Sequence, residues 1–149
     1  LSLIVDPIIS YHLEKLDFFM SFIQGTSKFE LQSSLQLTEF VDQLLEPLKK
    51  RRNFYIIKLG LHEALVNAVK HGNNLDPHKS IKVKRIITPN WCVWQIQDQG
   101  KGLEEKKRIF HLPKRVDSTN GRGLYIIHEC FDDVRWSPKG NRVQLALKR

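Results

Sequence analysis

The segment that most constrains this chain runs from Glu63 to Gly72 and reads Glu-Ala-Leu-Val-Asn-Ala-Val-Lys-His-Gly. Four polar residues recur in it at three- and four-residue steps, which brings them to one face of an α-helix: Glu63, Asn67, Lys70 and His71. The apolar residues between them can then face a core. A carboxylate and a carboxamide one turn apart can converge on one ligand, although a helix face exposed to water explains the same spacing.

A second motif, Asp98-Gln-Gly100-Lys-Gly102, follows directly after the apolar run 91–97. Alternation along a strand places Asp98 on the same side as Trp94. A carboxylate at the end of an apolar face is costly to bury unless a ligand or an ordered water donates hydrogen bonds to it. The glycines let the backbone turn away or approach a ligand closely. A plain turn after a strand is the alternative.

The third motif begins with Asn120-Gly121-Arg122-Gly123 and leads into an apolar helix expected to end at Cys130. Backbone N–H groups at a helix start have no partner within the helix, so they can bind phosphate. Taken alone, two glycines before a helix do not identify a phosphate site. Its position after the other two motifs is what makes it a candidate phosphate site.

Together and in this order, the three stretches resemble the sequence boxes of the GHKL ATPases, the superfamily that includes gyrase and the histidine kinases. Three details are similar to the anti-sigma-factor serine kinases: the short distance from Gly102 to Gly121, the Glu-x-x-x-Asn-Ala-x-x-His-Gly form of the first box and the Gly-Arg-Gly-Leu form of the third. The resemblance covers residues 28–149. It therefore predicts a histidine-kinase-like ATPase domain over 28–149, preceded by a helical extension over 1–27.

The resemblance implies ATP and Mg²⁺ as cofactors and assigns roles to individual residues. Glu63 is the implied general base, Asn67 the implied Mg²⁺ ligand, and Asp98 the implied acceptor of the adenine amino group. Mg²⁺ prefers oxygen ligands and keeps several waters, so one amide oxygen with phosphate oxygens is a reasonable set. The other implied nucleotide-binding residues are Lys70, Gly100, Gly102, Gly121, Arg122, Gly123 and Leu124.

Two basic residues are candidates to neutralise charge on the transferred phosphate, Lys70 and Arg122. An exposed side chain that forms salt bridges is the alternative for each. His71 is expected to cap or pack against the helix end rather than to react. Many superfamily members place Thr after Gly in the closing strand, where this chain has Asn141, so the contact made there is open.

The activity that the resemblance implies is that of an ATP-dependent serine/threonine protein kinase. Such a protein phosphorylates an anti-anti-sigma factor, its antagonist, and sequesters a sigma factor. A nucleotide-gated binding module without phosphate transfer is the alternative. Autophosphorylation on histidine is not expected, because His12 lies in a short apolar segment without the acidic neighbour of a phospho-acceptor box. The residues before the domain are expected either to extend a homodimer interface or to cover a sheet edge.

The positive charge of the chain is unevenly placed. The net charge is +8, yet residues 1–75 hold eight basic and eight acidic residues, so the excess lies in residues 76–149. Residues 101–122 alone carry seven basic and three acidic residues. This segment, between the second and third motifs, is expected either to form a positive lid over phosphates or to be a solvated loop. Direct nucleic-acid binding is not expected, because aromatic residues are not interleaved with the basic ones.

Hydrophobic periodicity predicts one α+β domain. Helices are expected over 7–23, 37–48 with an early end at Pro47, 51–70 and 121–130, and strands over 28–33, 81–87, 91–97, 134–137 and 143–147. Residues 25–28 read as a linker and 73–77 as a turn-rich loop. The fold class is a two-layer sandwich with a mixed, mostly antiparallel sheet covered on one face by helices, which is also the Bergerat fold that the resemblance implies.

Cys92 and Cys130 lie in separate apolar runs, where buried free thiols are common. Neither a disulfide framework nor a metal site is expected, and a reducing cytoplasm is the simplest compartment. No apolar run reaches the roughly 18 residues that a membrane-spanning helix requires. No membrane association is therefore expected.

Overall fold

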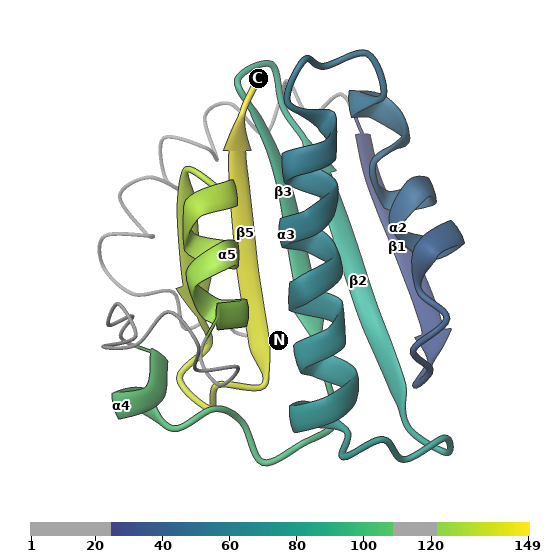
Figure 1. The fold of residues 1–149 in the computed structure, drawn as a ribbon, viewed down its shortest axis with the longest axis vertical. Coiled ribbons are helices and arrows are strands. Elements are labelled where there is room, and N and C mark those ends of the chain that lie inside the picture. The colour runs from purple at the N-terminus through teal and green to yellow at the C-terminus, as the bar shows by residue number, and fades with distance from the viewer. Residues whose placement is uncertain (1–24, 109–121) are drawn as a thin grey trace.

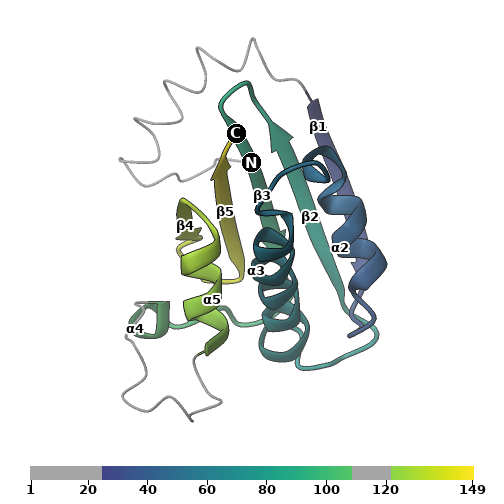
Figure 2. The same cartoon turned by 45° about the horizontal axis from the view of Figure 1, so that its top comes forward.

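The computed structural model describes residues 25–108 and 122–149 (Figure 1). Five strands form one sheet in the order β1-β2-β3-β5-β4, and helices α2, α3 and α5 cover one of its faces (Figures 1 and 2). Within the described ranges, each pair of neighbouring strands is antiparallel. These observations confirm the predicted α+β sandwich of a helical layer on a sheet.

The strands are β1 (Gly25–Gln32), β2 (Ser80–Ile87), β3 (Trp91–Gln97), β4 (Asp133–Trp136) and β5 (Arg142–Lys148). Both predicted hairpins, β2–β3 and β4–β5, are confirmed. The expected linker at 25–28 is wrong, because β1 begins at Gly25 and pairs with β2 from there on. Thr26 and Lys28 sit at exposed positions of this edge strand, where polar side chains face water, so the sequence there carries little strand signal.

The helices are α2 (Thr38–Leu44), a 3₁₀ turn (Glu46–Leu48), α3 (Phe54–Asn67), a π-helical segment η2 (Ala68–Gly72), α4 (Glu105–Arg108) and α5 (Arg122–Cys130). The early end predicted at Pro47 is confirmed, because proline lacks the N–H that would continue α2. The helix expected over 51–70 divides into α3 and η2. The short helix α4 was not predicted.

The core lies between the helical layer and the sheet. Trp94 and Ile96 of β3 are buried together with Leu61 and Leu65 of α3. The buried side chains of α3 recur at three- and four-residue steps, as a helix packed on a sheet requires. Because α3 packs over β3, the polar side chains near the helix end and the residue that follows β3 are placed at the same end of the domain.

Helices α3 and α5 pack against each other closely (Figure 1). A Cβ atom at Gly60 of α3 would lie 2.5 Å from Cys130 Cβ and 2.9 Å from Phe131 Cε2. The glycine therefore brings the two helices together without a side chain between them. This contact joins the middle of α3 to the end of α5.

Among the described residues, no helix combines the length and the apolar character needed to cross a membrane. The helix predicted over 7–23 lies outside the described residues. The domain boundary at residue 27 remains a prediction, although β1 already begins at Gly25.

Candidate functional site

Glu63 and Asn67 lie one turn apart on α3, and both side chains are half-buried. Their functional groups point to the first turn of α5. A Cβ atom at Gly123 would lie 3.2 Å from Glu63 Oε2 and 3.5 Å from both Asn67 Nδ2 and Oδ1. Gly123 thus leaves the backbone at the start of α5 open to a carboxylate and a carboxamide. The first and third motifs of the sequence meet at this point.

The spacing predicts a regular helix that continues to Lys70, but the α-helical geometry of α3 ends at Asn67. The helix widens into η2, in which the N–H of Asn73 donates to Ala68 O, five residues earlier, at 2.8 Å. Single turns of π-helix of this kind occur often at functional sites. Lys70 and His71 are exposed, whereas Glu63 and Asn67 are half-buried. The sequence predicted that His71 caps or packs against the helix end. Its side chain is exposed, so it does not pack there.

Asp98 follows β3 on the buried side of the sheet, where strand alternation predicts it, and is itself half-buried. Burial raises the pKa of its carboxyl group, and the N–H of Gly100, which donates to Asp98 Oδ1 at 2.7 Å, opposes the rise together with Lys139 and Lys79. A carboxylate in such a place is stabilised by further hydrogen-bond donors. Asp98 can accept them from a ligand at the domain edge.

Gly72, the last residue of η2, lies directly against Asp98. A Cβ atom at Gly72 would overlap the carboxyl group of Asp98, and one at Gly100 would overlap the carbonyl oxygen of Gly72. The first and second motifs therefore touch through backbone and a single carboxyl group. Only glycine at positions 72 and 100 leaves room for this contact.

Gly102 has a different neighbour. Its φ is +92°, and a Cβ atom there would overlap Lys139 O in the turn between β4 and β5. Leu103 N donates to Gly140 O at 2.8 Å beside it. Both Gly100 and Gly102 thus permit close approaches to other parts of the backbone. Their contact with phosphate remains a prediction.

The β4–β5 turn also contacts Asp98 through Asn141, the position where the family pattern has Thr. Asp98 N donates to Asn141 O at 2.9 Å, and Asn141 Nδ2 donates to Asp98 O at 3.4 Å. The side chain of Asn141 is thereby turned to the backbone of Asp98. It helps to hold the strand end at which the Asp98 carboxyl group sits.

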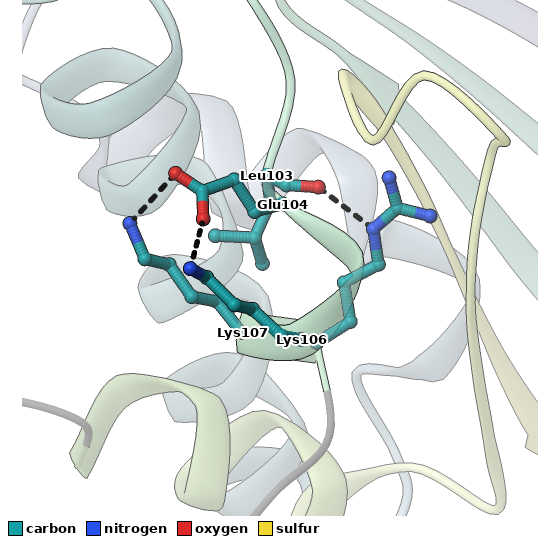
Figure 3. Close-up of polar contacts among 5 residues, drawn as sticks. Leu103, Glu104, Lys106 and Lys107 are labelled. Carbon is teal, nitrogen blue, oxygen red and sulfur yellow. Dashed lines mark hydrogen bonds and ion pairs between the residues drawn. The ribbon is translucent and has the colours of Figure 1, made fainter.

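Three basic residues after Gly102 make contacts within the protein. Glu104 pairs with Lys107 at 3.1 Å and with Lys106 at 3.3 Å (Figure 3). Arg108 donates to three carbonyl oxygens, Leu103 O at 2.7 Å, Pro138 O at 2.8 Å and Ser137 O at 3.1 Å. Arg108 therefore fastens α4 to the β4–β5 turn. Of the other basic residues in 101–122, Lys101 and Arg122 are exposed, and Lys114 and Arg115 lie outside the described residues.

The third motif is described in part. Gly121 lies outside the described residues, Arg122 is exposed as the first residue of α5, and Leu124 packs against the core. The backbone at the start of α5, rather than the side chain of Leu124, is the part that can face a ligand. Its N–H groups have the orientation that favours an anion.

Sequence reasoning missed Asn73, which it placed in a turn-rich loop. Asn73 is fully buried and donates from Nδ2 to Ser80 O at 3.0 Å, while its Oδ1 accepts from Gln99 N at 2.8 Å. Asparagine is common in turns, so its identity alone gives no signal of burial. The one sequence signal of a role at the site is that Asn73 directly follows the motif that ends at Gly72.

The donor set is compatible with Mg²⁺ bound together with phosphates. Within the part of the chain that the structure describes, no three His, Cys, Asp or Glu residues form a group that could hold a metal ion. Mg²⁺ at nucleotide sites takes one or two protein oxygens and completes its shell with phosphate oxygens and water. The side chain of Asn67, with Glu63 one turn away, offers oxygens of this kind at the start of α5.

The two cysteines are buried and carry free thiols, as predicted. Burial raises the pKa of Cys92 to about 11 and also raises that of Cys130. Thiols with raised pKa values carry little thiolate at neutral pH and are poor nucleophiles. These cysteines belong to the packing between helices and sheet and not to the candidate site.

Comparison with known proteins identifies the family of this chain. Residues 36–147 match the family described as the histidine kinase-like ATPase domain, and such a domain binds ATP. The chain is 28% identical over 102 residues to the anti-sigma F factor of Geobacillus kaustophilus, which is 66% of this chain and 63% of that protein. It is 29% identical over 109 residues to the anti-sigma F factor of Anoxybacillus flavithermus, which is 71% of this chain and 68% of that protein. The chain thus spans less than two thirds of the first of these relatives. With its family match over most of its length, the chain belongs to the histidine kinase-like ATPase domain family.

Proposed function

We propose that this protein is an ATP-dependent serine/threonine protein kinase that acts as an anti-sigma factor. Its substrate would be an anti-anti-sigma protein, and its second partner a sigma factor that it sequesters. Family membership and relatives that bear the name anti-sigma F factor support this proposal. Both proposed partners are proteins, and no contact with nucleic acid is proposed.

One observation carries the proposal: Glu63 and Asn67 converge on the first turn of α5 at Gly123. A nucleotide whose phosphates lie against the α5 backbone would place its terminal phosphate beside a carboxylate. A site that only senses nucleotide has no need of that carboxylate. The position of Glu63 therefore favours chemistry at the terminal phosphate over binding alone.

The remaining residues would hold the nucleotide at both ends. Asp98 would accept the adenine amino group, while Gly100, Gly102, Gly121 and Gly123 would allow backbone to approach the phosphates. Mg²⁺ bound through Asn67 would neutralise part of the phosphate charge. Leu124 would contribute its backbone N–H, because its side chain packs against the core.

The proposed chemistry is transfer of the terminal phosphoryl group to a hydroxyl of the partner. Glu63 takes the hydroxyl proton as the hydroxyl oxygen bonds to phosphorus. The bond from phosphorus to the bridging oxygen breaks, and ADP leaves with those electrons. Base assistance of this kind contributes roughly 10²–10⁴ in rate. Positioning and charge neutralisation, the latter from Lys70 or Arg122, would supply most of the remainder.

A second candidate function is a nucleotide-gated binding module that transfers no phosphate. The observation in its favour is that Arg108 donates to three backbone carbonyl oxygens, so this cation of the basic segment is engaged within the protein. In this case ATP and ADP would change the affinity for a protein partner, and Glu63 would act only as a polar contact.

Transfer of labelled phosphate separates the two functions. The protein is incubated with γ-labelled ATP, Mg²⁺ and small anti-anti-sigma domains, beside Glu63→Gln and the control Glu39→Gln, whose residue is exposed on α2. We expect label on the partner with the unchanged protein and with the control. Glu63→Gln should lose transfer by about 10²-fold or more while still binding ATP. Equal transfer by Glu63→Gln would refute the role of the base.

A further inference from the structure

Asn73 connects three elements that come from different parts of the sequence. Its backbone N–H donates to Ala68 O at the start of η2, its Nδ2 donates to Ser80 O at the start of β2, and its Oδ1 accepts from Gln99 N in the loop after β3. The side chain is fully buried, with a relative exposure of 0%. A buried amide stays in place only when its polar groups are paired, and both ends of this one are.

The backbone on both sides of Asn73 has an unusual conformation, and the Asn73 side chain is buried. The π-helical segment η2 ends at the residue before it, and the two residues after it have left-handed φ values, 54° at Asn74 and 59° at Leu75. Left-handed φ at residues other than glycine costs on the order of 1 kcal/mol or more each. Leu75 N donates to Val69 O at 2.9 Å, which closes the turn.

The Gln99 N–H that Asn73 holds lies between two residues of the candidate site. Asp98 precedes it and Gly100 follows it, and both lie in contact with Gly72, the neighbour of Asn73. The same short segment, residues 72–73, thus touches the loop sterically and by a hydrogen bond. On its other side it continues α3, which carries Glu63 and Asn67.

We propose that Asn73 is a positioning residue that fixes the loop of Asp98 and Gly100 relative to the helix of Glu63 and Asn67. It thereby sets the separation between the adenine end and the phosphate end of the nucleotide site. The link to nucleotide rests on the proposed function. The hydrogen bond from Gln99 N to Asn73 Oδ1 does not depend on the proposed function.

Amide hydrogen exchange and ADP binding test this proposal on the same samples. In Asn73→Ala the Gln99 N–H loses its acceptor, so its exchange should accelerate about tenfold or more, while backbone amides in the middle of β3 keep their rates. The dissociation constant for ADP with Mg²⁺ should rise by about tenfold, as expected for one displaced hydrogen-bonded contact. Global weakening of the fold would instead accelerate all slow amides together.

Thr88→Ala is the matched control. Thr88 is also a buried polar residue, 2% exposed, and its Oγ1 accepts from Trp91 N at 2.9 Å. It lies in the β2–β3 turn, at the end of β3 away from Asp98. We expect this variant to lose stability while Gln99 exchange and ADP affinity stay within about twofold of the unchanged protein. If Asn73→Ala does not fold, Asn73→Ser, whose hydroxyl is shorter than the amide, takes its place in both measurements.

Unchanged Gln99 exchange in the folded variant, or an ADP dissociation constant within about twofold, would overturn the proposal. An equal loss of ADP affinity in Thr88→Ala would do the same, since it would show that destabilisation alone weakens binding. Absence of ADP binding by the unchanged protein would contradict the proposed function instead. The exchange rate of Gln99 would then decide by itself whether Asn73 holds the loop.

Discussion

Gly72 and Asp98 are in direct contact, although 26 positions separate them in the sequence and they come from different motifs. The end of the helix that carries Glu63 rests on the carboxyl group of Asp98 without an intervening side chain. The contact joins the two ends of the candidate nucleotide site.

The substitution Gly72→Ala should weaken nucleotide binding by about tenfold or more, because the new Cβ atom would overlap Asp98 and displace its carboxyl group. Isothermal titration with ADP and Mg²⁺ measures the effect. The matched control is Gly25→Ala, since a Cβ atom at Gly25 meets no other atom within 4 Å. Unchanged affinity in Gly72→Ala would show that the position of Asp98 does not matter for nucleotide.

Asp98→Asn should lose the preference for ATP over GTP without losing stability at pH 7. Burial raises the pKa of Asp98, so its carboxyl group binds protons more readily in the folded than in the unfolded state. A group of this kind destabilises the fold increasingly as pH rises from its unfolded pKa through its folded pKa. Removing the charge should therefore leave the free energy of unfolding equal or higher.

Urea unfolding of Asp98→Asn at pH 7 and near pH 4 checks the sign. The stability advantage of the variant should be larger at pH 7 and should shrink toward pH 4, where the carboxyl group takes up its proton. Competition between ATP and GTP on the same samples checks the adenine contact. A variant that is less stable at pH 7 and still prefers ATP would argue against both roles of Asp98.

Arg108 should behave as a structural residue and not as a phosphate ligand. Arg108→Ala removes donors to Leu103 O, Ser137 O and Pro138 O and should lower the free energy of unfolding by about 1–2 kcal/mol. Arg108→Lys should not restore it, because an ammonium group lacks the planar fork of donors. Urea unfolding measures both, with Lys106→Ala as a control expected to change stability by less than about 0.5 kcal/mol. Full recovery in Arg108→Lys would mean that charge alone matters.

Gly60→Ala should destabilise the protein, although alanine is the better helix former. The new Cβ atom would lie 2.5 Å from Cys130 Cβ, so α5 has to move. Overpacking of this kind costs typically about 1–3 kcal/mol, against a gain of about 1 kcal/mol from helix propensity. Chemical denaturation gives the net change. A more stable variant would show that the end of α5 shifts freely against α3.

The sequence predicted the elements whose signals are local. The alternation in β3 placed Asp98 correctly on the buried side, and Pro47 marked the end of α2. The convergence of Glu63 and Asn67 on Gly123 depends on how α3 and α5 pack, which spacing alone does not reveal. Family resemblance supplied the roles for these residues.

Other features depend on contacts between distant segments and left no readable pattern. The π-helical widening follows Asn67, where the helix end meets the loop after β3, and a regular 3.6-residue period therefore misplaced Lys70 and His71. The sequence around Asn73 is typical of an exposed turn, and only the folded structure shows its hydrogen bonds with Ser80 and Gln99. Arg108 was counted as part of a positive lid because sequence does not show that carbonyl groups of the β4–β5 turn engage it.

The most direct test of the account is thermal unfolding with and without Mg²⁺ and ATP, for the unchanged protein and for Asp98→Asn. Nucleotide at about 100 times its dissociation constant adds about 2.7 kcal/mol to the free energy of unfolding, which raises the melting temperature by several degrees. We expect a Mg²⁺-dependent rise that is clearly smaller in Asp98→Asn. No rise at saturating nucleotide, or an equal rise in the variant, would contradict a nucleotide site built on Asp98 and Asn67.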